Sequence, residues 1–160
     1  MNIPVDKNSF DVVICTEVIE HVPYPIDVIK SISSILKPGG KLLITAPLQS
    51  GLHQEPYHFY GGFTKYWFLK FLGENDFKDI IITPNGSLFT TIISYNFTLI
   101  KECFEDILYS KFVLKILSIF MLSFFLPIFL VTLLPLYFAE KVYRRSGFTA
   151  GYHVTAIKNK

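Results

Sequence analysis

The side chains best suited to chemistry lie together near the start of the chain, in the order Glu17-x-x-Glu20-His21. Spacings of three and four residues place them on one face if a helical turn begins here. Two carboxylates and an imidazole can bind a divalent cation; Mg²⁺ prefers oxygen ligands and Zn²⁺ also accepts nitrogen. Without a metal, His21 or the later His58 is the best candidate for a general base, because imidazole titrates near neutral pH.

The segments around these residues alternate between strand-like and helix-like patterns. Apolar runs rich in β-branched residues are typical of buried parallel strands, and Pro25 suits the first turn of a helix that the Pro38-Gly39-Gly40 turn ends. The predicted strands are residues 10–15, 41–47, 77–83 and 151–157, and the predicted helices are 25–36 and 65–74, the second capped by Thr64. This alternation predicts a doubly wound α/β sheet, which binds ligands beyond the carboxyl ends of its strands.

Composition excludes several classes of protein. Of the 160 residues, 51% are hydrophobic and 18% are charged, which is too apolar for a disordered chain. A net charge of +2 shows no basic excess, so no nucleic-acid partner is expected. Two cysteines are too few for a disulfide-rich scaffold, and the first residues resemble no secretory signal. We therefore expect one α/β domain on the cytosolic side of a membrane, joined to an apolar segment.

The apolar segment is the run from Ile116 to Ala139, which contains no charged residue. As a helix it would be roughly 36 Å long, enough to cross a hydrocarbon core of about 30 Å. Lysine and arginine residues flank both ends of the run. The run predicts membrane contact, and the alternative is a buried helix of a soluble protein.

Two longer motifs resemble a known family. Residues 8–22 (NSFDVVICTEVIEHV) resemble the fourth-strand motif of class I S-adenosylmethionine-dependent methyltransferases, and residues 36–44 (LKPGGKLLI) resemble the turn and fifth strand of that family. The resemblance implies a partial Rossmann-like sheet holding the family's strands in the order 4-5-7-6, with a long apolar helical insertion between the last two strands. The implied parts are residues 1–86 for the methyltransferase half, 87–148 for the insertion and 149–160 for the returning strand.

The chain departs from the family at the cofactor cradle. Family members hold S-adenosylmethionine with a glycine-rich loop after the first strand and an acidic residue after the second, and no such loop is found in this sequence. We therefore interpret the chain as the C-terminal half of a methyltransferase. The strand at residues 11–15 would then form an open apolar edge, which invites pairing with another chain. A separate N-terminal half is the expected partner there.

The resemblance also implies roles for particular residues. Thr16 and Glu17 match positions that contact the cofactor. In ubiquinone-biosynthesis O-methyltransferases and small-RNA 2′-O-methyltransferases a similar Glu-x-x-Glu-His motif holds a metal, and in the RNA enzymes a later histidine, which His58 resembles in position, completes the site. Many other relatives use no metal. The implied ligands of Mg²⁺ or Zn²⁺ are Glu17, Glu20, His21 and His58. His53, Tyr57 and Tyr60 fall in the loop that forms the acceptor pocket, although packing against the apolar segment explains them equally well.

The position of the apolar run limits how it can meet a membrane. A last strand that returns to the sheet requires both ends of the run on one side, and a break at Pro127 would give a re-entrant hairpin. The alternatives are a helix lying in the interface, or one transmembrane helix followed by an unstructured tail. We expect a methyltransferase on the cytoplasmic side of a membrane that acts on a lipid-like or small-molecule acceptor. The alternative is a non-catalytic, membrane-anchored subunit that needs a separate cofactor-binding half.

Overall fold

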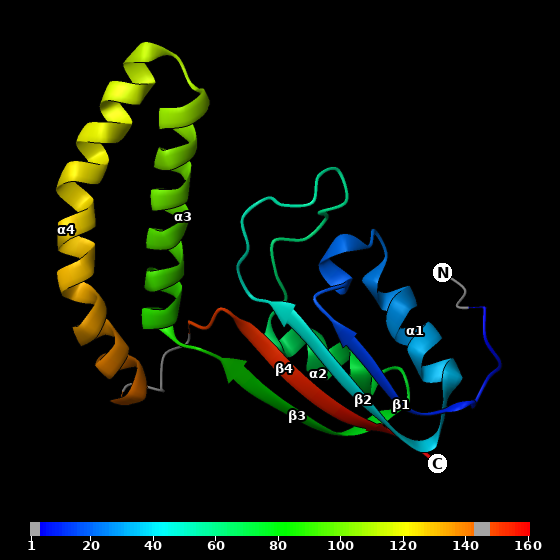
Figure 1. Cartoon of the computed structure of the whole chain (residues 1–160). Coiled ribbons are helices and arrows are strands. Elements are labelled where there is room, and N and C mark those ends of the chain that lie inside the picture. The colour runs from blue at the N-terminus through cyan, green and yellow to red at the C-terminus, as the bar shows by residue number, and fades with distance from the viewer. Residues whose placement is uncertain (1–3, 143–147) are drawn as a thin grey trace. The chain divides into compact units, whose positions relative to one another are not determined.

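The computed structural model describes residues 4–142 and 148–160, and the chain divides into two compact units. We call Met1–Asn85 with Ala150–Lys160 the sheet unit, and Gly86–Thr149 the hairpin unit. The sheet unit contains β1 (Phe10–Thr16), the short 3₁₀ helix η1 (Ile19–His21), α1 (Pro25–Ile35), β2 (Leu36–Pro47), α2 (Lys65–Gly73), β3 (Phe77–Asn85) and β4 (Gly151–Lys158) (Figure 1). The hairpin unit contains α3 (Leu88–Tyr109) and α4 (Phe112–Val142).

The four strands form one sheet in the order β1-β2-β4-β3. The β1–β2 pair is parallel, whereas β4 runs antiparallel to both β2 and β3. The order is the one predicted from the family resemblance, with the long helices inserted between β3 and β4, so the predicted α/β class and strand order are confirmed. β1 is an edge strand.

Local signals in the sequence explain where the helices of the sheet unit begin. Pro25 occupies the first turn of α1, where the missing N–H costs nothing. The Thr64 hydroxyl accepts a hydrogen bond of 3.3 Å from the Trp67 N–H and so caps α2, as predicted. The predicted Pro38-Gly39-Gly40 turn instead lies within β2 as an irregularity in its pairing with β1. A Cβ on Gly40 would approach the Lys37 carbonyl oxygen to 2.8 Å, so this bend requires glycine.

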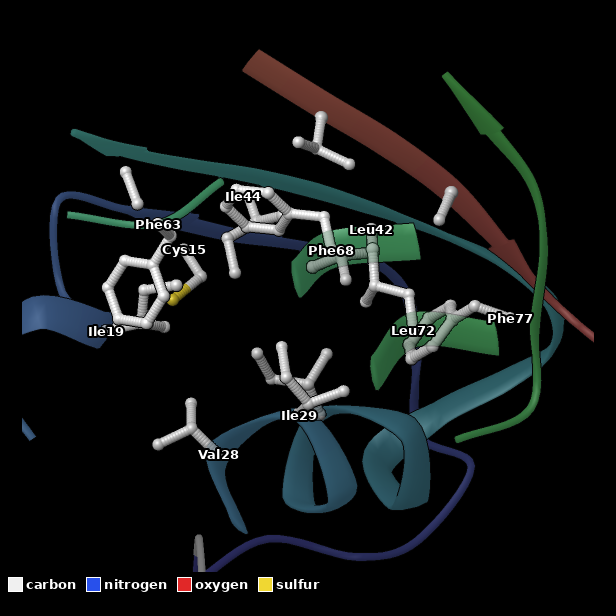
Figure 2. Packing of buried hydrophobic residues seen from close by; sticks show 14 of the residues in the cluster. Cys15, Ile19, Val28, Ile29, Leu42, Ile44, Phe63, Phe68, Leu72 and Phe77 are labelled. Atoms are coloured by element: carbon white, nitrogen blue, oxygen red, sulfur yellow. The ribbon is translucent and has the colours of Figure 1, made fainter. Parts of the chain in front are cut away.

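The core lies between one face of the sheet and the helices α1 and α2 (Figure 2). Ile29 of α1 and Phe68 and Leu72 of α2 pack against alternate residues of the strands, and all three side chains are fully buried. The strand residues that face this core are Val13, Cys15, Leu42, Ile44, Ile82, Val154 and Ala156. Their alternation along each strand fixes the register of the sheet.

The opposite face of the sheet carries exposed apolar residues. The strand register places Ile14, Leu43, Thr155 and Ile81 in one row across that face. Ile14 and Ile81 are 67% and 63% exposed. Sheets with parallel strands are normally covered on both faces. The sheet of this unit differs, because one face is covered by helices and the other is open.

The hairpin unit consists of two long helices that pack side by side and antiparallel (Figure 1). Ser118 of α4 donates a hydrogen bond of 3.3 Å to the Asp106 carboxylate of α3, and the Phe97 and Phe129 rings lie 5.3 Å apart. The chain reverses between the helices, where the Ser110 N–H bonds to the Asp106 carbonyl oxygen.

The predicted break at Pro127 does not occur, because α4 continues through both Pro127 and Pro135. The chain reverses instead between α3 and α4, near Ser110. Within the described ranges, α4 is the one helix long and apolar enough to cross a membrane.

Candidate active site

The motif residues Glu17, Glu20 and His21 lie just beyond the carboxyl end of β1. Glu17 adopts a left-handed backbone conformation with φ of 51°, which turns the chain out of the strand and into η1. The Glu20 carbonyl oxygen accepts hydrogen bonds from the backbone N–H groups of Phe59 (2.9 Å) and Tyr60 (3.2 Å). These bonds attach η1 to the loop between β2 and α2.

Glu20 is a buried carboxyl group without a complete set of partners. Its side chain is 1% exposed, and Oε2 is buried with no hydrogen-bond partner. Burial raises the pKa of Glu20, and the nearby charge of Glu17 raises it further, while His21 and His53 partly oppose the shift. A buried carboxyl group of this kind attracts a proton or a cation.

Backbone carbonyl groups of the loop hold the rings of two histidines, His21 and His53, near Glu20. Nδ1 of His21 lies 2.9 Å from the Tyr57 carbonyl oxygen, and Nδ1 of His53 lies 2.9 Å from the Gly51 carbonyl oxygen. A carbonyl can only accept, so in the neutral rings both Nδ1 atoms carry the hydrogen and both Nε2 atoms keep a lone pair. Nε2 of His21 lies 3.9 Å from Oε1 of Glu20. The loop carbonyls therefore leave two imidazole lone pairs beside a buried carboxyl group.

His58 completes a cluster of three imidazole rings. Its ring centroid lies 4.4 Å from that of His53 and 5.6 Å from that of His21. Nε2 of His58 is 3.2 Å from the Ser50 hydroxyl, and Nδ1 is buried with no hydrogen-bond partner. In the described part of the chain, one group of side chains can hold a metal ion: Glu20, His21 and His53, with ligand atoms all within 4.8 Å of one another.

The other predicted site residues lie elsewhere around this loop. The Glu17 carboxylate accepts a hydrogen bond of 2.7 Å from the Thr45 hydroxyl at the end of β2, and Glu17 does not belong to the group that can hold a metal ion. Thr16 ends β1 opposite Thr45. The Tyr57 side chain is exposed. Tyr57 contributes to the site through its backbone carbonyl oxygen, which bonds to the His21 ring.

Tyr60 donates its hydroxyl hydrogen to the Pro23 carbonyl oxygen at 3.0 Å and lies against the Phe63 ring. The sequence predicts His53 in the acceptor pocket and does not associate it with Glu20. The available signal was the position of His53 in the loop after the second strand, since no motif spacing links residues so far apart in the sequence.

A shallow apolar groove lies along the free edge of β1, between that strand and α1. Its volume is about 340 Å³, and its lining includes Ile14, Thr16, Val28 and Ile32. Cys15 also contributes to the groove, and burial raises the pKa of its thiol to about 11, which keeps it protonated. The groove therefore offers apolar contact and no reactive thiolate.

Comparison with known proteins gives a family match and partial relatives. The family model of a methyltransferase domain matches residues 1–80. A ubiquinone biosynthesis O-methyltransferase of Xanthomonas euvesicatoria is 54% identical over 37 residues, which are 23% of this chain and 16% of that protein. The enzyme of the same name from Coxiella burnetii is 45% identical over 40 residues, 25% of this chain and 17% of that protein. The chain therefore aligns with about a sixth of the length of these curated relatives.

Two solved structures share the fold at low sequence identity. An S-adenosylmethionine-dependent methyltransferase from Archaeoglobus fulgidus matches with a TM-score of 0.53 and 15% identity, over 96% of this chain and 62% of that one. A putative sarcosine dimethylglycine methyltransferase from Galdieria sulphuraria matches with a TM-score of 0.54 and 14% identity, over 99% of this chain and 56% of that one. At these identities the likeness describes the fold alone.

Proposed function

Because the chain belongs to the methyltransferase domain family, we propose that it forms the acceptor side of an enzyme that transfers a methyl group from S-adenosylmethionine. The observation that carries the proposal is the Glu20–His21–His53 cluster beyond the carboxyl end of β1. Open α/β sheets bind their ligands at that edge. The relatives named O-methyltransferase favour an acceptor oxygen.

In this reaction the cofactor supplies an electrophilic methyl group on its sulfonium centre. The protein must then take a proton from the acceptor hydroxyl as its oxygen attacks. His21 suits this role, because the Tyr57 carbonyl holds the hydrogen on Nδ1 and leaves the lone pair on Nε2. Glu20, 3.9 Å from that nitrogen, stabilises the imidazolium that results. His58 is the second candidate base, and its Nδ1 has no hydrogen-bond partner in the described structure.

A divalent cation also fits this cluster. The Glu20 carboxylate and one ring nitrogen each of His21 and His53 form a mixed oxygen and nitrogen donor set that suits Zn²⁺ better than Mg²⁺. A cation held there would lower the pKa of an acceptor hydroxyl. Glu17 and His58 belonged to the predicted ligand set, and Glu17 is now engaged by Thr45.

Calorimetric titration of the full chain with ZnCl₂ tests the metal site. We expect binding by the natural chain and by Glu17→Gln, and loss of binding in Glu20→Gln. Equal binding by Glu20→Gln and the natural chain would contradict the assignment.

We place the acceptor at a membrane, on the cytoplasmic side. Support comes from α4, whose exposed residues are apolar along most of its length. A lipid-like or lipid-linked acceptor would reach an enzyme held at the bilayer, and a small soluble acceptor is the other possibility. No nucleic-acid partner is proposed, since the net charge is only +2.

The part of the proposed enzyme that would bind the cofactor requires a partner that covers the edge strand β1 and the exposed face of the sheet. Ile14 on the edge strand and Ile81 on the open face are both mostly exposed. We propose that a separate N-terminal half adds a strand beside β1 and covers this face. The second candidate function follows from the same surface: the chain is a non-catalytic, membrane-anchored subunit that completes such a half.

Radioactive methyl transfer tests the proposed activity. The full chain in liposomes is incubated with S-adenosylmethionine labelled in its methyl group and a lipid extract from the expression host. When a methyltransferase N-terminal half is added to supply the cofactor side, we expect labelled lipid with the natural chain and with the control Lys30→Ala, and loss of labelling with His21→Ala. Cofactor titration accompanies the assay: binding without transfer would overturn the acceptor proposal. Cofactor binding and methyl transfer by the chain alone would refute the need for a separate half, and transfer by the pair that is unchanged by His21→Ala would favour the non-catalytic subunit.

A further inference from the structure

The exposed surfaces of the two hairpin helices differ: that of α4 is apolar, whereas that of α3 mixes polar residues with apolar ones such as Phe104 and Leu108. The outer side of α4 is apolar: Phe120 and Val131, for example, are 70% and 76% exposed. No charged residue interrupts the sequence between Ile116 and Ala139. An exposed apolar surface of this length needs a cover other than water.

The outer side of α3 carries a polar stripe, which we define as Ser94, Thr98, Lys101 and Glu105. Their spacing of four, three and four residues places them on one line along the helix, and all four are exposed. Lys101 and Glu105 form an ion pair of 3.4 Å. Cys103 is buried on the side of α3 that faces α4, about half a turn away from the stripe. The stripe therefore points away from α4.

Hydroxyl groups on α4 find their partners within the hairpin. The Ser123 hydroxyl donates to the Ile119 carbonyl oxygen at 2.8 Å, and the Thr132 hydroxyl donates to the Ile128 carbonyl oxygen at 3.0 Å. Ser118 donates to Asp106 across the helix pair. In hydrocarbon, where no water can bind polar groups, such internal bonding is required. The outer side of α4 is therefore suited to lipid acyl chains.

The register of the two helices decides how the hairpin can meet the lipid. Contacts pair Asp106 with Ser118 and Phe97 with Phe129, so Lys101 lies alongside the part of α4 between Ser118 and Phe129. If α4 crossed the bilayer, the exposed ion pair of the stripe would lie within the hydrocarbon, which is unfavourable. If the hairpin lies parallel to the surface, the stripe reaches the headgroups.

We infer that the α3–α4 hairpin lies in the plane of the membrane, with α4 among the acyl chains and the polar stripe of α3 toward water. This orientation rests on the proposed membrane association of the chain. Lys111 and Lys115 near one end of α4, and Lys141 near the other, favour anionic headgroups. By itself, α4 has too little polarity for an interfacial helix, which normally has one polar face. The paired α3 supplies the missing polar side.

Site-directed labelling of the full chain on sealed liposomes of phosphatidylcholine and phosphatidylglycerol tests the orientation. Cys15 and Cys103 are first replaced by alanine, and flotation and circular dichroism check binding and folding. Single cysteines are then introduced by Thr98→Cys in the stripe, Ser110→Cys in the turn and Leu134→Cys on the outer side of α4, with Lys160→Cys as control. The probes are a membrane-impermeant maleimide added outside and, in separate samples, a fluorophore with lipids brominated in their acyl chains.

We expect the maleimide to label Thr98→Cys, Ser110→Cys and Lys160→Cys from the same side, with loss of labelling at Leu134→Cys. Acyl-chain bromines should quench a fluorophore at residue 134 and leave one at residue 98 unquenched. Protection of Ser110→Cys while Lys160→Cys reacts would show a crossing hairpin and overturn the orientation. Protection of Leu134→Cys without quenching would show a second copy over α4 and also overturn it. Absence of flotation would refute the membrane placement itself, whereas failed methyl transfer with the expected labelling would refute only the catalytic proposal.

Discussion

The two units use the same kinds of apolar residue in opposite ways. In the sheet unit Phe68 and Leu42 are fully buried, whereas Phe120 and Val131 on α4 are 70% and 76% exposed. A water-soluble core is stabilised by removing apolar surface from water. The comparison shows that the sheet unit buries its large apolar residues within its own chain, whereas α4 leaves most of its apolar residues exposed, which is the basis of the membrane association that we propose.

The hydrogen bonding of carboxyl groups differs between the units in a second way. In the hairpin unit the Glu140 carboxylate accepts hydrogen bonds from the Ser87 hydroxyl and from the Thr90 N–H. In the sheet unit, Oε2 of Glu20 is buried with no such partner. Buried polar groups are normally paired, and the exceptions among the described residues, Glu20 Oε2 and His58 Nδ1, both belong to the site that we propose.

The largest effect expected from this comparison concerns burial. Phe68→Ala should lower the free energy of unfolding by about 3–5 kcal/mol, because it leaves a cavity in the core beneath the sheet. Phe120→Ala on α4 should change it by less than about 0.5 kcal/mol in detergent, as exposed substitutions do. Urea unfolding followed by circular dichroism measures both. Equal losses would mean that the outer side of α4 is covered within the chain.

The next effect concerns the lipid-facing side of the hairpin. Val131→Asp should weaken binding to liposomes by up to about 3 kcal/mol, roughly a hundredfold in partition, because it places a charge among acyl chains. Ser94→Asp in the polar stripe of α3 is the matched control and should leave partition nearly unchanged. Centrifugal flotation at several lipid concentrations measures the difference, and similar weakening by both variants would contradict the distinction between the two outer surfaces.

A smaller effect tests the local signals of the sheet unit. Thr64→Ala removes the hydroxyl that accepts from the Trp67 N–H and should cost about 1 kcal/mol of unfolding free energy. Lys65→Ala, next to it on the exposed first turn of α2, is the control and should stay within about 0.5 kcal/mol. Urea titration distinguishes the two variants. If they lose the same stability, the cap is not what holds the start of α2.

The smallest effect concerns pH. Burial raises the folded pKa of Glu20 above its ordinary value of 4.5, so the folded chain binds the proton more tightly than the unfolded chain. Its contribution to stability is full below pH 4.5 and is lost as the pH rises through the folded pKa. In Glu20→Gln this pH-dependent loss should disappear, whereas Glu17→Gln should keep it. Thermal melts across this range, without added metal, would contradict the assignment if the natural chain and Glu20→Gln changed in parallel.

Much of the sheet unit could be predicted because its signals are local. Pro25 and Thr64 each mark the start of a helix through contacts with the nearby backbone. Apolar residues at alternating positions are enough to predict the strands. The order of the strands followed from the family resemblance. The open face of the sheet was harder to predict from the sequence, because it depends on the register that places Ile14 and Ile81 in one row.

The sequence by itself determined the types and order of the elements, the charge-free length of α4 and the chemistry available to the motif. Only the tertiary structure brought His53 to Glu20 and His21, directed Glu17 to Thr45, and gave α4 a polar partner in α3. The reason is physical. Helix and strand signals act over a few residues, whereas the site depends on bonds such as the one from His21 to the Tyr57 carbonyl, which form only once the loop has closed against η1.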